Sequence, residues 1–203
     1  MLSARLYDTV LAGAERRALR AWRRDLLSRL SGTVLEIGAG TGANLHAYGP
    51  ALDRLLLLEP DPAMRQRLVA RAGTACGGRA CVLAGSAARL PLRDRSVDAV
   101  VNTLVLCSVR PLDRALSEIR RVLRPGGQLH VIEHVAAEPG TPVRRVQNLL
   151  APGWSRVGGG CSLVRPTREL LEAAGFDVTG LRPDSLPVPV PFLRPVIRGT
   201  ARP

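Results

Sequence analysis

The sequence contains no lysine and few aromatic residues, and both shortages bear on nucleic-acid binding. All 29 basic residues are arginines, which outnumber the 17 acidic residues and give a formal net charge of +12. Replacement of every lysine by arginine, together with abundant alanine, glycine and proline, indicates a coding bias rather than selection for phosphate contacts. At 3% aromatic content, platforms for base stacking are scarce. We therefore expect no nucleic-acid partner.

Cysteines and long apolar runs are also few. The four cysteines, Cys76, Cys81, Cys107 and Cys161, lack the paired short spacings of zinc-binding motifs, so we predict no metal site. No charged segment precedes an apolar one at the N-terminus, which argues against secretion and a disulfide framework. The longest apolar stretch, residues 99–109, is far shorter than the ~20 residues that a membrane-spanning helix needs. We expect a cytoplasmic protein.

Short apolar runs alternate with helical patterns along the chain. With 203 residues, 46% of them hydrophobic, we predict a single domain over residues 1–203. The apolar runs are residues 33–37, 54–59, 80–84, 98–104 and 128–135. The helical patterns are residues 44–48, 62–72 and 111–123, and the C-terminal third predicts a helix at 167–174, a strand from Phe176 and a last segment at 196–201. Strands this apolar, separated by helices, indicate an α/β fold with a parallel sheet covered on both faces.

Two further segments are candidate covers for a site. Residues 3–30 predict one or two amphipathic helices with many arginines, so residues 1–30 form either a helical cap or a helix packed on the sheet. Residues 139–165 form a long insertion, with a short helix expected at 143–150. Because loops of that length in a compact domain are usually functional, we predict that the insertion covers a substrate.

The first apolar run ends in a glycine-rich loop, Gly38-Ala39-Gly40-Thr41-Gly42-Ala43. Glycines let the backbone turn sharply and let a ligand approach the main chain closely. The spacing fits a dinucleotide fingerprint and also a nucleoside-binding loop. Glu36 favours the second, because an acid beside the loop suits a cationic amino-acid tail and suits a pyrophosphate poorly.

The second apolar run ends in Glu59-Pro60-Asp61-Pro62. A carboxylate about 20 residues past the glycine loop can accept hydrogen bonds from both ribose hydroxyls. A carboxylate can also cap the helix that follows, with proline at the first helical position. We predict that Glu59 contacts ribose and that Asp61 is the helix cap.

Residues 36–44, Glu59 and residues 123–127 together resemble the class I S-adenosylmethionine-dependent methyltransferases. The resemblance implies a Rossmann-like, doubly wound sheet of seven strands, mostly parallel with an antiparallel last strand. It implies S-adenosylmethionine as cofactor and S-adenosylhomocysteine as product. In that family the glycine loop holds the methionine end, the acid after the second strand holds the ribose, and the loop after the third strand meets the adenine. The cofactor residues implied here are Glu36, Gly38, Gly40, Gly42, Asn44, Glu59, Pro60, Ser86, Ala87, Asn102 and Leu104.

A narrower similarity, to the alkyl thiol S-methyltransferases, covers residues 33 to the C-terminus. The strings that carry it are residues 102–109, 118–127, 133–135 and 160–163, with Trp154, Arg165 and Thr167. Two departures are visible. Those relatives begin with a hydrophobic segment where this chain has an arginine-rich one, and many have an aspartate where Gly159 stands.

The similarity implies methyl transfer to a small-molecule thiol. His134 is the candidate general base, because an imidazole with a pKa near ~6.5 suits removal of a thiol proton. His134 alternatively orients Glu133 or a backbone carbonyl. The predicted acceptor pocket consists of Tyr7, Cys107, His134, Trp154 and Cys161. Arg165 either holds a substrate anion or is an ordinary exposed arginine.

Two other functions stay open at this point. One is methylation of a phospholipid amine or quinone at a membrane surface, which the basic N-terminal helix would contact. The other is a nicotinamide-dependent oxidoreductase, or a binding module, that uses the same glycine loop. Oligomeric state has no signal in the sequence.

Overall fold

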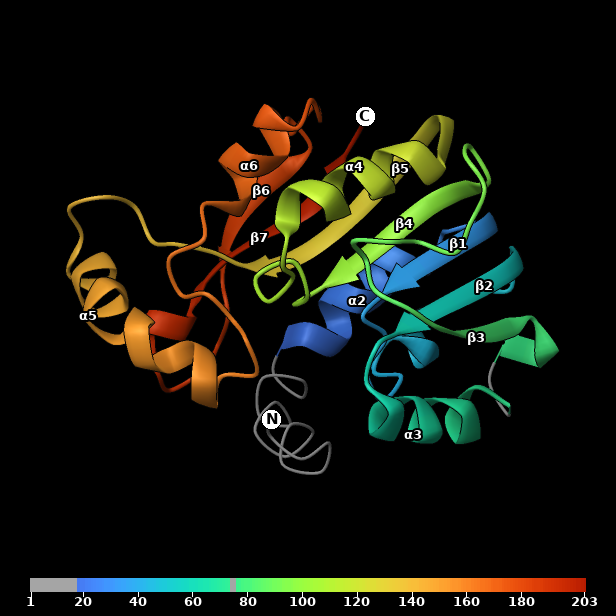
Figure 1. The fold of residues 1–203 in the computed structure, drawn as a ribbon, viewed down its shortest axis with the longest axis horizontal. Coiled ribbons are helices and arrows are strands. Elements are labelled where there is room, and N and C mark those ends of the chain that lie inside the picture. The colour runs from blue at the N-terminus through green and yellow to red at the C-terminus, as the bar shows by residue number, and fades with distance from the viewer. Residues whose placement is uncertain (1–17, 74–75) are drawn as a thin grey trace.

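The computed structural model describes residues 18–73 and 76–203, which form a seven-stranded mixed sheet with helices packed on it (Figure 1). The strands are β1 (Gly32–Ile37), β2 (Leu52–Glu59), β3 (Ala80–Ala84), β4 (Val97–Thr103), β5 (Leu123–His134), β6 (Leu181–Ser185) and β7 (Pro195–Ala201). Their order in the sheet is β3-β2-β1-β4-β5-β7-β6. The pairs from β3 to β5 are parallel, whereas β7 runs antiparallel to both β5 and β6. The predicted fold class is confirmed.

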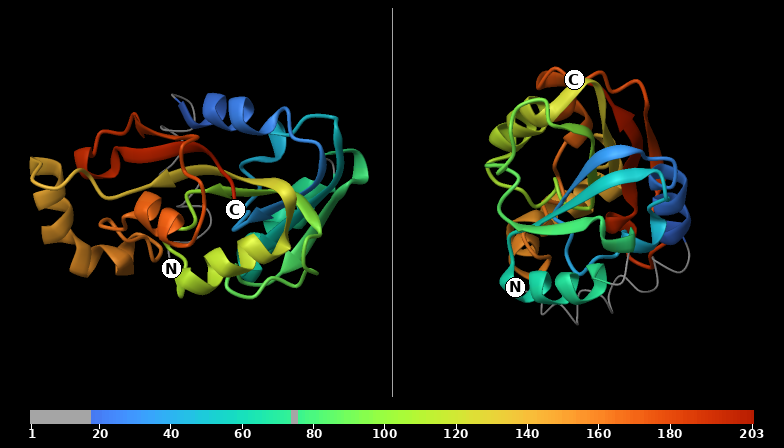
Figure 2. Two further views of the ribbon diagram at one scale, coloured as in Figure 1. Left: turned by 90° about the horizontal axis from the view of Figure 1, so that it is seen from above. Right: turned by 90° about the vertical axis from the view of Figure 1, so that its right-hand side faces the viewer.

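Helices cover both faces of this sheet. They are α2 (Arg20–Leu27), α3 (Pro62–Ala72), α4 (Leu112–Val122), α5 (Pro142–Val157) and α6 (Thr167–Ala173), with 3₁₀ turns at Leu45–Ala47, Cys76–Gly78 and Pro191–Leu193. Seen from above, α2 and α4 lie on opposite faces of the sheet, and α5 extends beyond the β5 end (Figure 2). No helix in the described ranges is both long and apolar enough to cross a membrane.

The core has two main layers, one on each face, and β2 shows why. Along β2, Leu56 and Leu58 pack in the layer with α4 and α6, whereas Leu55 and Leu57 pack in the layer with α2 and α3. Successive side chains of a strand point to opposite faces, so a strand buried on both sides must be apolar throughout. The unbroken leucine run of β2 therefore places it in the interior of a parallel sheet.

The predicted strand from Phe176 is wrong, because the chain turns there and the strand begins at Leu181. Phe176 is buried in the core layer below α6, and Gly175 before it has a positive φ of 82°. Asp177 then closes a local turn by accepting hydrogen bonds from the backbone and hydroxyl of Thr179. Apolar character at Phe176 thus reflects core packing rather than an extended ladder.

Two helical predictions also differ from the structure in extent. The expected helix at 44–48 is a single 3₁₀ turn. The expected helix at 143–150 is instead the 16-residue α5, which continues through Pro152. Proline normally ends a helix, but here Trp154 packs edge-on against Phe192 with ring centroids 5.3 Å apart. Tertiary packing of the last turns outweighs the local preference.

Candidate active site

The glycine loop lies at the carboxyl end of β1, where ligands of open α/β sheets bind. Gly38, Gly40 and Gly42 all have positive φ values, of 58°, 58° and 89°. A Cβ atom on Gly38 would lie 2.6 Å from the Val105 side chain, and one on Gly42 would lie 2.6 Å from the Leu45 side chain. Backbone conformation therefore favours glycine at all three positions, and limited space also favours it at Gly38 and Gly42.

Glu36 lies buried under this loop and is held by two donors. The Tyr48 hydroxyl donates to Oε2 at 2.6 Å, and the Asn44 amide donates to Oε1 at 2.9 Å. Burial raises the pKa of Glu36 to about 7, although the hydrogen bonds and the charge of Arg23 oppose the shift. A cation bound beside this carboxyl would compensate the cost of its burial.

Arg23 is a site residue that the sequence reasoning missed. Its guanidinium is 4% exposed and donates hydrogen bonds to Asn44 Oδ1 and, at 3.1 Å, to Thr103 Oγ1. The other buried residues on this side are apolar: Leu19, just before α2, and Leu27, at its end. The sequence feature that could have revealed it is the spacing: Arg23 is four residues from each of those leucines and so lies on the same helix face. A buried cation thus lies within one polar network with Glu36.

Glu59 and Asp61 divide two roles at the end of β2. Glu59 is buried; its Oε2 accepts from Gly40 N at 2.8 Å and its Oε1 accepts from Asp61 N at 2.9 Å. Asp61 caps α3 by accepting from Ala63 N and Met64 N at 2.8 and 2.9 Å, as predicted. Each carboxylate oxygen has two lone pairs, so Glu59 retains acceptor capacity for further donors.

The remaining predicted cofactor residues lie at the same edge. Pro60 is exposed beside Glu59, Ser86 is exposed and Ala87 is buried just after β3. Asn102, at the end of β4, donates to Glu133 Oε2 at 2.9 Å and accepts from Leu106 N at 3.1 Å. Leu104 has a positive φ of 59°, a conformation that costs a non-glycine residue about 1–3 kcal/mol and clusters at functional sites.

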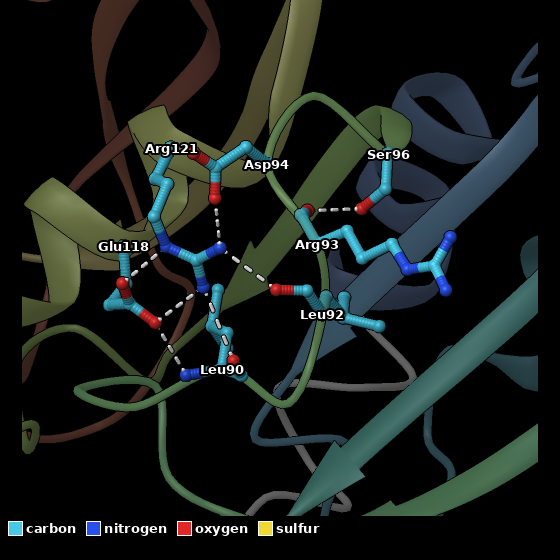
Figure 3. Close-up of polar contacts among 7 residues, drawn as sticks. All are labelled: Leu90, Leu92, Arg93, Asp94, Ser96, Glu118 and Arg121. Carbon is cyan, nitrogen blue, oxygen red and sulfur yellow. Dashed lines mark hydrogen bonds and ion pairs between the residues drawn. The ribbon is translucent and has the colours of Figure 1, made fainter.

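The loop after β3 is anchored on α4 by one arginine (Figure 3). Arg121 forms ion pairs with Glu118 at 2.6 Å and Asp94 at 2.7 Å. It also donates to the backbone oxygens of Leu90 and Leu92, while Leu90 N donates to Glu118 Oε2 at 2.7 Å. This arrangement fixes the segment that follows Ser86 and Ala87.

His134 is buried at the end of β5, beside Cys161. Its Nε2 lies 3.3 Å from the Phe192 carbonyl oxygen, and its Nδ1 lies 3.8 Å from Cys161 Sγ. A carbonyl oxygen only accepts, so Nε2 carries the hydrogen and Nδ1 faces the sulfur. Burial lowers the pKa of His134, but its contacts with Cys161 and Phe192 raise the pKa by more.

Cys107 and Cys161 meet at this point. A hydrogen bond from Cys107 lowers the pKa of the Cys161 thiol to about 5; burial opposes the shift, and His134 adds to it. The same hydrogen bond, with burial, raises the pKa of Cys107 well above its usual range. The opposite shifts favour the thiolate form at Cys161 and the protonated form at Cys107, beside His134. Three of the predicted acceptor residues, Cys107, His134 and Cys161, are thus brought together.

Glu133 and Gln147 form hydrogen bonds with backbone groups around His134. Glu133 is fully buried and accepts from Val105 N at 3.1 Å and His134 N at 3.0 Å, and burial raises its pKa. Gln147, missed in the sequence, is buried on α5 and donates to the backbone oxygens of Val135 at 3.2 Å and Phe192 at 3.0 Å. Polar side chains on a mostly exposed helix gave no signal for this role.

Three other predicted positions complete the picture. Trp154 lies on α5 against Phe192, whose carbonyl contacts His134. Arg165 is half-buried rather than an exposed arginine, and it donates to the backbone oxygens of Leu106 and, at 2.8 Å, Val109. Tyr7 lies outside the described residues.

A hollow of about 660 Å³ lies away from this edge, between α4 and α6. Leu116, Arg120 and Leu170 are among its lining residues, and Arg165 also lines it. None of the predicted cofactor residues and none of the residues predicted to form the acceptor pocket lines it. The concentration of buried polar groups at the strand ends, rather than the size of a hollow, identifies the candidate site.

Comparisons with known proteins agree with this geometry. A family model described as a methyltransferase domain matches residues 35–131. Human thiol S-methyltransferase TMT1A is 40% identical over 172 residues, covering 83% of this chain and 70% of the relative. Human thiol S-methyltransferase TMT1B is 39% identical over 178 residues, covering 82% and 72%.

Solved structures share the fold. A methyltransferase of Thermotoga maritima, described as a possible histamine N-methyltransferase, has a TM-score of 0.65 at 22% identity, covering 96% of this chain and 94% of that one. A complex of DhpI with S-adenosylhomocysteine has a TM-score of 0.67 at 19% identity, covering 98% and 91%. At these identities the likeness concerns the fold alone.

The chain is therefore a class I S-adenosylmethionine-dependent methyltransferase. Within that class it belongs to the branch that contains the thiol S-methyltransferases TMT1A and TMT1B. The dinucleotide interpretation that the glycine loop left open is thereby excluded, and the cofactor is S-adenosylmethionine.

Proposed function

We propose that this enzyme transfers the methyl group of S-adenosylmethionine to a small-molecule thiol. The observation that carries the proposal is the group formed by His134, Cys161 and Cys107 at the end of β5, next to the strands that end in the cofactor residues. Relatives that share about two-fifths of their residues are thiol S-methyltransferases, which supports the same acceptor class here.

The residues under the glycine loop fit the amino-acid end of the cofactor. An α-amino acid carries an ammonium and a carboxylate, and the pocket offers a buried acid, Glu36, and a buried cation, Arg23, linked through Asn44. We propose that Glu36 receives the ammonium and Arg23 the carboxylate. Glu59 then accepts from the ribose, and Ser86 and Ala87 contact the adenine.

When bound, the cofactor supplies an electrophilic methyl group on a sulfonium. The protein's own tasks are to orient the acceptor sulfur, to exclude water and to remove a proton. An ordinary thiol with a pKa of about 8.5 is already a few per cent ionised at neutral pH, so a modest base suffices.

We propose that the pair of His134 and Cys161 takes up the proton that the acceptor thiol loses. Because Nε2 of His134 donates to Phe192, only Nδ1 is oriented toward the acceptor side. The pair holds one proton between Nδ1 and Sγ and takes up a second from the acceptor thiol. Trp154 on α5, within the insertion 139–165, provides an apolar wall over this site, in keeping with a single domain whose insertion covers the acceptor.

A labelled-methyl transfer screen across thiols, amines, phenols and fatty acids tests the acceptor class. We expect label on thiols, with alkyl thiols preferred over charged ones. Transfer confined to amines or phenols would contradict the assignment. Competition by S-adenosylhomocysteine is the control that the transfer uses the predicted cofactor site.

The enzyme is proposed to work in the cytoplasm, with peripheral contact to membranes through α5. On that helix Val146, Leu149 and Val157 are 41%, 79% and 61% exposed and share one side. Arg145 and Arg156 lie beside them, and α5 contains no acidic residue. Cationic amphipathic helices of this kind bind anionic membrane surfaces.

Co-sedimentation with vesicles tests this contact. We expect binding to phosphatidylserine-containing vesicles that weakens with salt and with Leu149→Gln, whereas Val69→Gln, at an exposed apolar site on α3, leaves it unchanged. Binding lost on deleting residues 1–17 and unaffected by Leu149→Gln would assign the contact to the N-terminus instead. The predicted N-terminal contact falls largely on residues outside the described ranges.

A further inference from the structure

The segments that carry Cys107 and Cys161 run side by side. Ser162 N donates to the backbone oxygen of Cys107 at 2.9 Å. Gly160, two residues before Ser162, lies beside Ser108, which follows Cys107: a Cβ atom placed on Gly160 would lie 3.7 Å from Ser108 Cβ. Both cysteines are free thiols, and each shifts the pKa of the other, raising that of Cys107 and lowering that of Cys161.

The two thiols differ in access and in charge. Cys161 is half-buried, whereas Cys107 is 3% exposed. His134 stabilises negative charge on Cys161, and Cys107 keeps its proton. Cysteines that sense oxidants combine a thiolate, partial exposure and a neighbouring resolving thiol. Cys161 meets the first two conditions and Cys107 the third.

We propose that Cys161 and Cys107 form a peroxide-sensitive dithiol. The Cys161 thiolate attacks one peroxide oxygen, the O–O bond breaks, and Cys161 becomes a sulfenic acid while hydroxide leaves. The Cys107 thiol then attacks the Cys161 sulfur, an S–S bond forms and water leaves. In total the thiolate and the thiol lose two electrons, and the peroxide is reduced to one hydroxide and one water. The hydroxide takes a proton from solvent and becomes the second water.

The consequence for activity rests on the proposed function. The disulfide removes the thiolate that pairs with His134 and ties the insertion after β5 to the loop after β4. Methyl transfer should stop, while binding of S-adenosylhomocysteine at Glu36 and Glu59 continues. Oxidation thus acts on the acceptor side of the enzyme alone.

Peptide mapping of the full-length enzyme after treatment with hydrogen peroxide tests the chemistry without any acceptor. We expect a peptide pair joined through Cys107 and Cys161 that dithiothreitol separates, and loss of two titratable thiols. The Cys76→Ser/Cys81→Ser variant is the matched control and should form the same bond. Cys107→Ser should stop at a sulfenic acid trapped by dimedone, and Cys161 should be oxidised about tenfold faster than Cys81.

Thermal stabilisation by S-adenosylhomocysteine shows that each variant is folded. A folded protein that forms no Cys107–Cys161 bond, or that loses thiols only through Cys76 and Cys81, would overturn the proposal. If the bond forms but no thiol is ever methylated, the dithiol stands and the proposed acceptor class falls. If thiols are methylated and peroxide has no effect on either the thiols or the activity, the proposed acceptor class stands and the dithiol proposal falls.

Discussion

The cofactor side and the acceptor side of this site are built in different ways. The cofactor side uses short motifs at the ends of β1 and β2, such as Glu36 and Asn44, eight residues apart. The acceptor side joins distant segments: Cys161 meets His134 across 27 residues, and His134 meets Phe192 across 58. The difference teaches that cofactor chemistry is tied to the sheet itself, whereas acceptor chemistry depends on where an insertion packs. Variants on the two sides should therefore affect different steps.

The largest expected effect is that of substituting His134, which should impair the acceptor side and leave the cofactor side unchanged. His134→Ala should lower turnover about 10²–10⁴-fold, because the His134–Cys161 pair that takes up the acceptor proton is then broken. The affinity for S-adenosylhomocysteine, measured by calorimetry, should stay unchanged. His134→Gln preserves a donor for the Phe192 oxygen but takes up no proton, so it should be equally slow. A fast His134→Gln enzyme would reduce the residue to a positioning role.

Glu59→Ala should produce the converse result. Loss of the paired ribose contacts, and of the acceptor for Gly40 N and Asp61 N, should weaken cofactor binding by about 2–4 kcal/mol, roughly 30- to 1,000-fold in Kd. Turnover at saturating cofactor should change little. Asp61→Ala, which removes only the helix cap, is the control and should reduce stability by about 1 kcal/mol. Unchanged affinity in Glu59→Ala would disprove the ribose assignment.

Arg23→Gln tests whether Arg23, on the cofactor side, contacts the carboxylate of the cofactor. Loss of a buried charge-assisted contact should weaken S-adenosylhomocysteine binding about 10- to 100-fold. Binding of methylthioadenosine, which has no amino-acid tail, should be unaffected. Arg24→Gln changes an exposed arginine on the same helix and should leave both affinities as they are. Equal losses for both ligands would show that Arg23 shapes the pocket without contacting the carboxylate.

The last expected effect is a pH dependence of cofactor binding. The pKa of Glu36 is raised to about 7 in the free enzyme, and a bound ammonium favours its ionised form. Binding therefore releases a proton below that pH, so affinity should rise by up to about tenfold per pH unit between about pH 5 and 7 and then level off. Glu36→Gln should bind more weakly with a flat profile over this range. A sloping profile in that variant would place the titrating group elsewhere.

The same contrast explains what the sequence could predict. Strand positions followed from apolar runs, and Asp61 followed from a local capping pattern, because both depend on neighbouring residues. Arg23 and Gln147 were missed because each bonds to a residue far along the chain, Thr103 for Arg23 and Phe192 for Gln147. Phe176 was misassigned because burial alone does not distinguish a strand from a turn packed under a helix. Long-range packing is what a single sequence leaves undetermined.

One carbonyl oxygen links the insertion to the chemistry. The oxygen of Phe192 accepts from Gln147 Nε2 at 3.0 Å and from His134 Nε2 at 3.3 Å, so both of its lone pairs are engaged. No lone pair of this oxygen is left to accept a hydrogen bond from water, and its bond with Nε2 fixes the tautomer of the His134 imidazole. Any tilt of α5 that carried Gln147 away would admit water to that oxygen and loosen the ring. The position of α5 and the proton affinity of His134 therefore both depend on the Phe192 carbonyl oxygen.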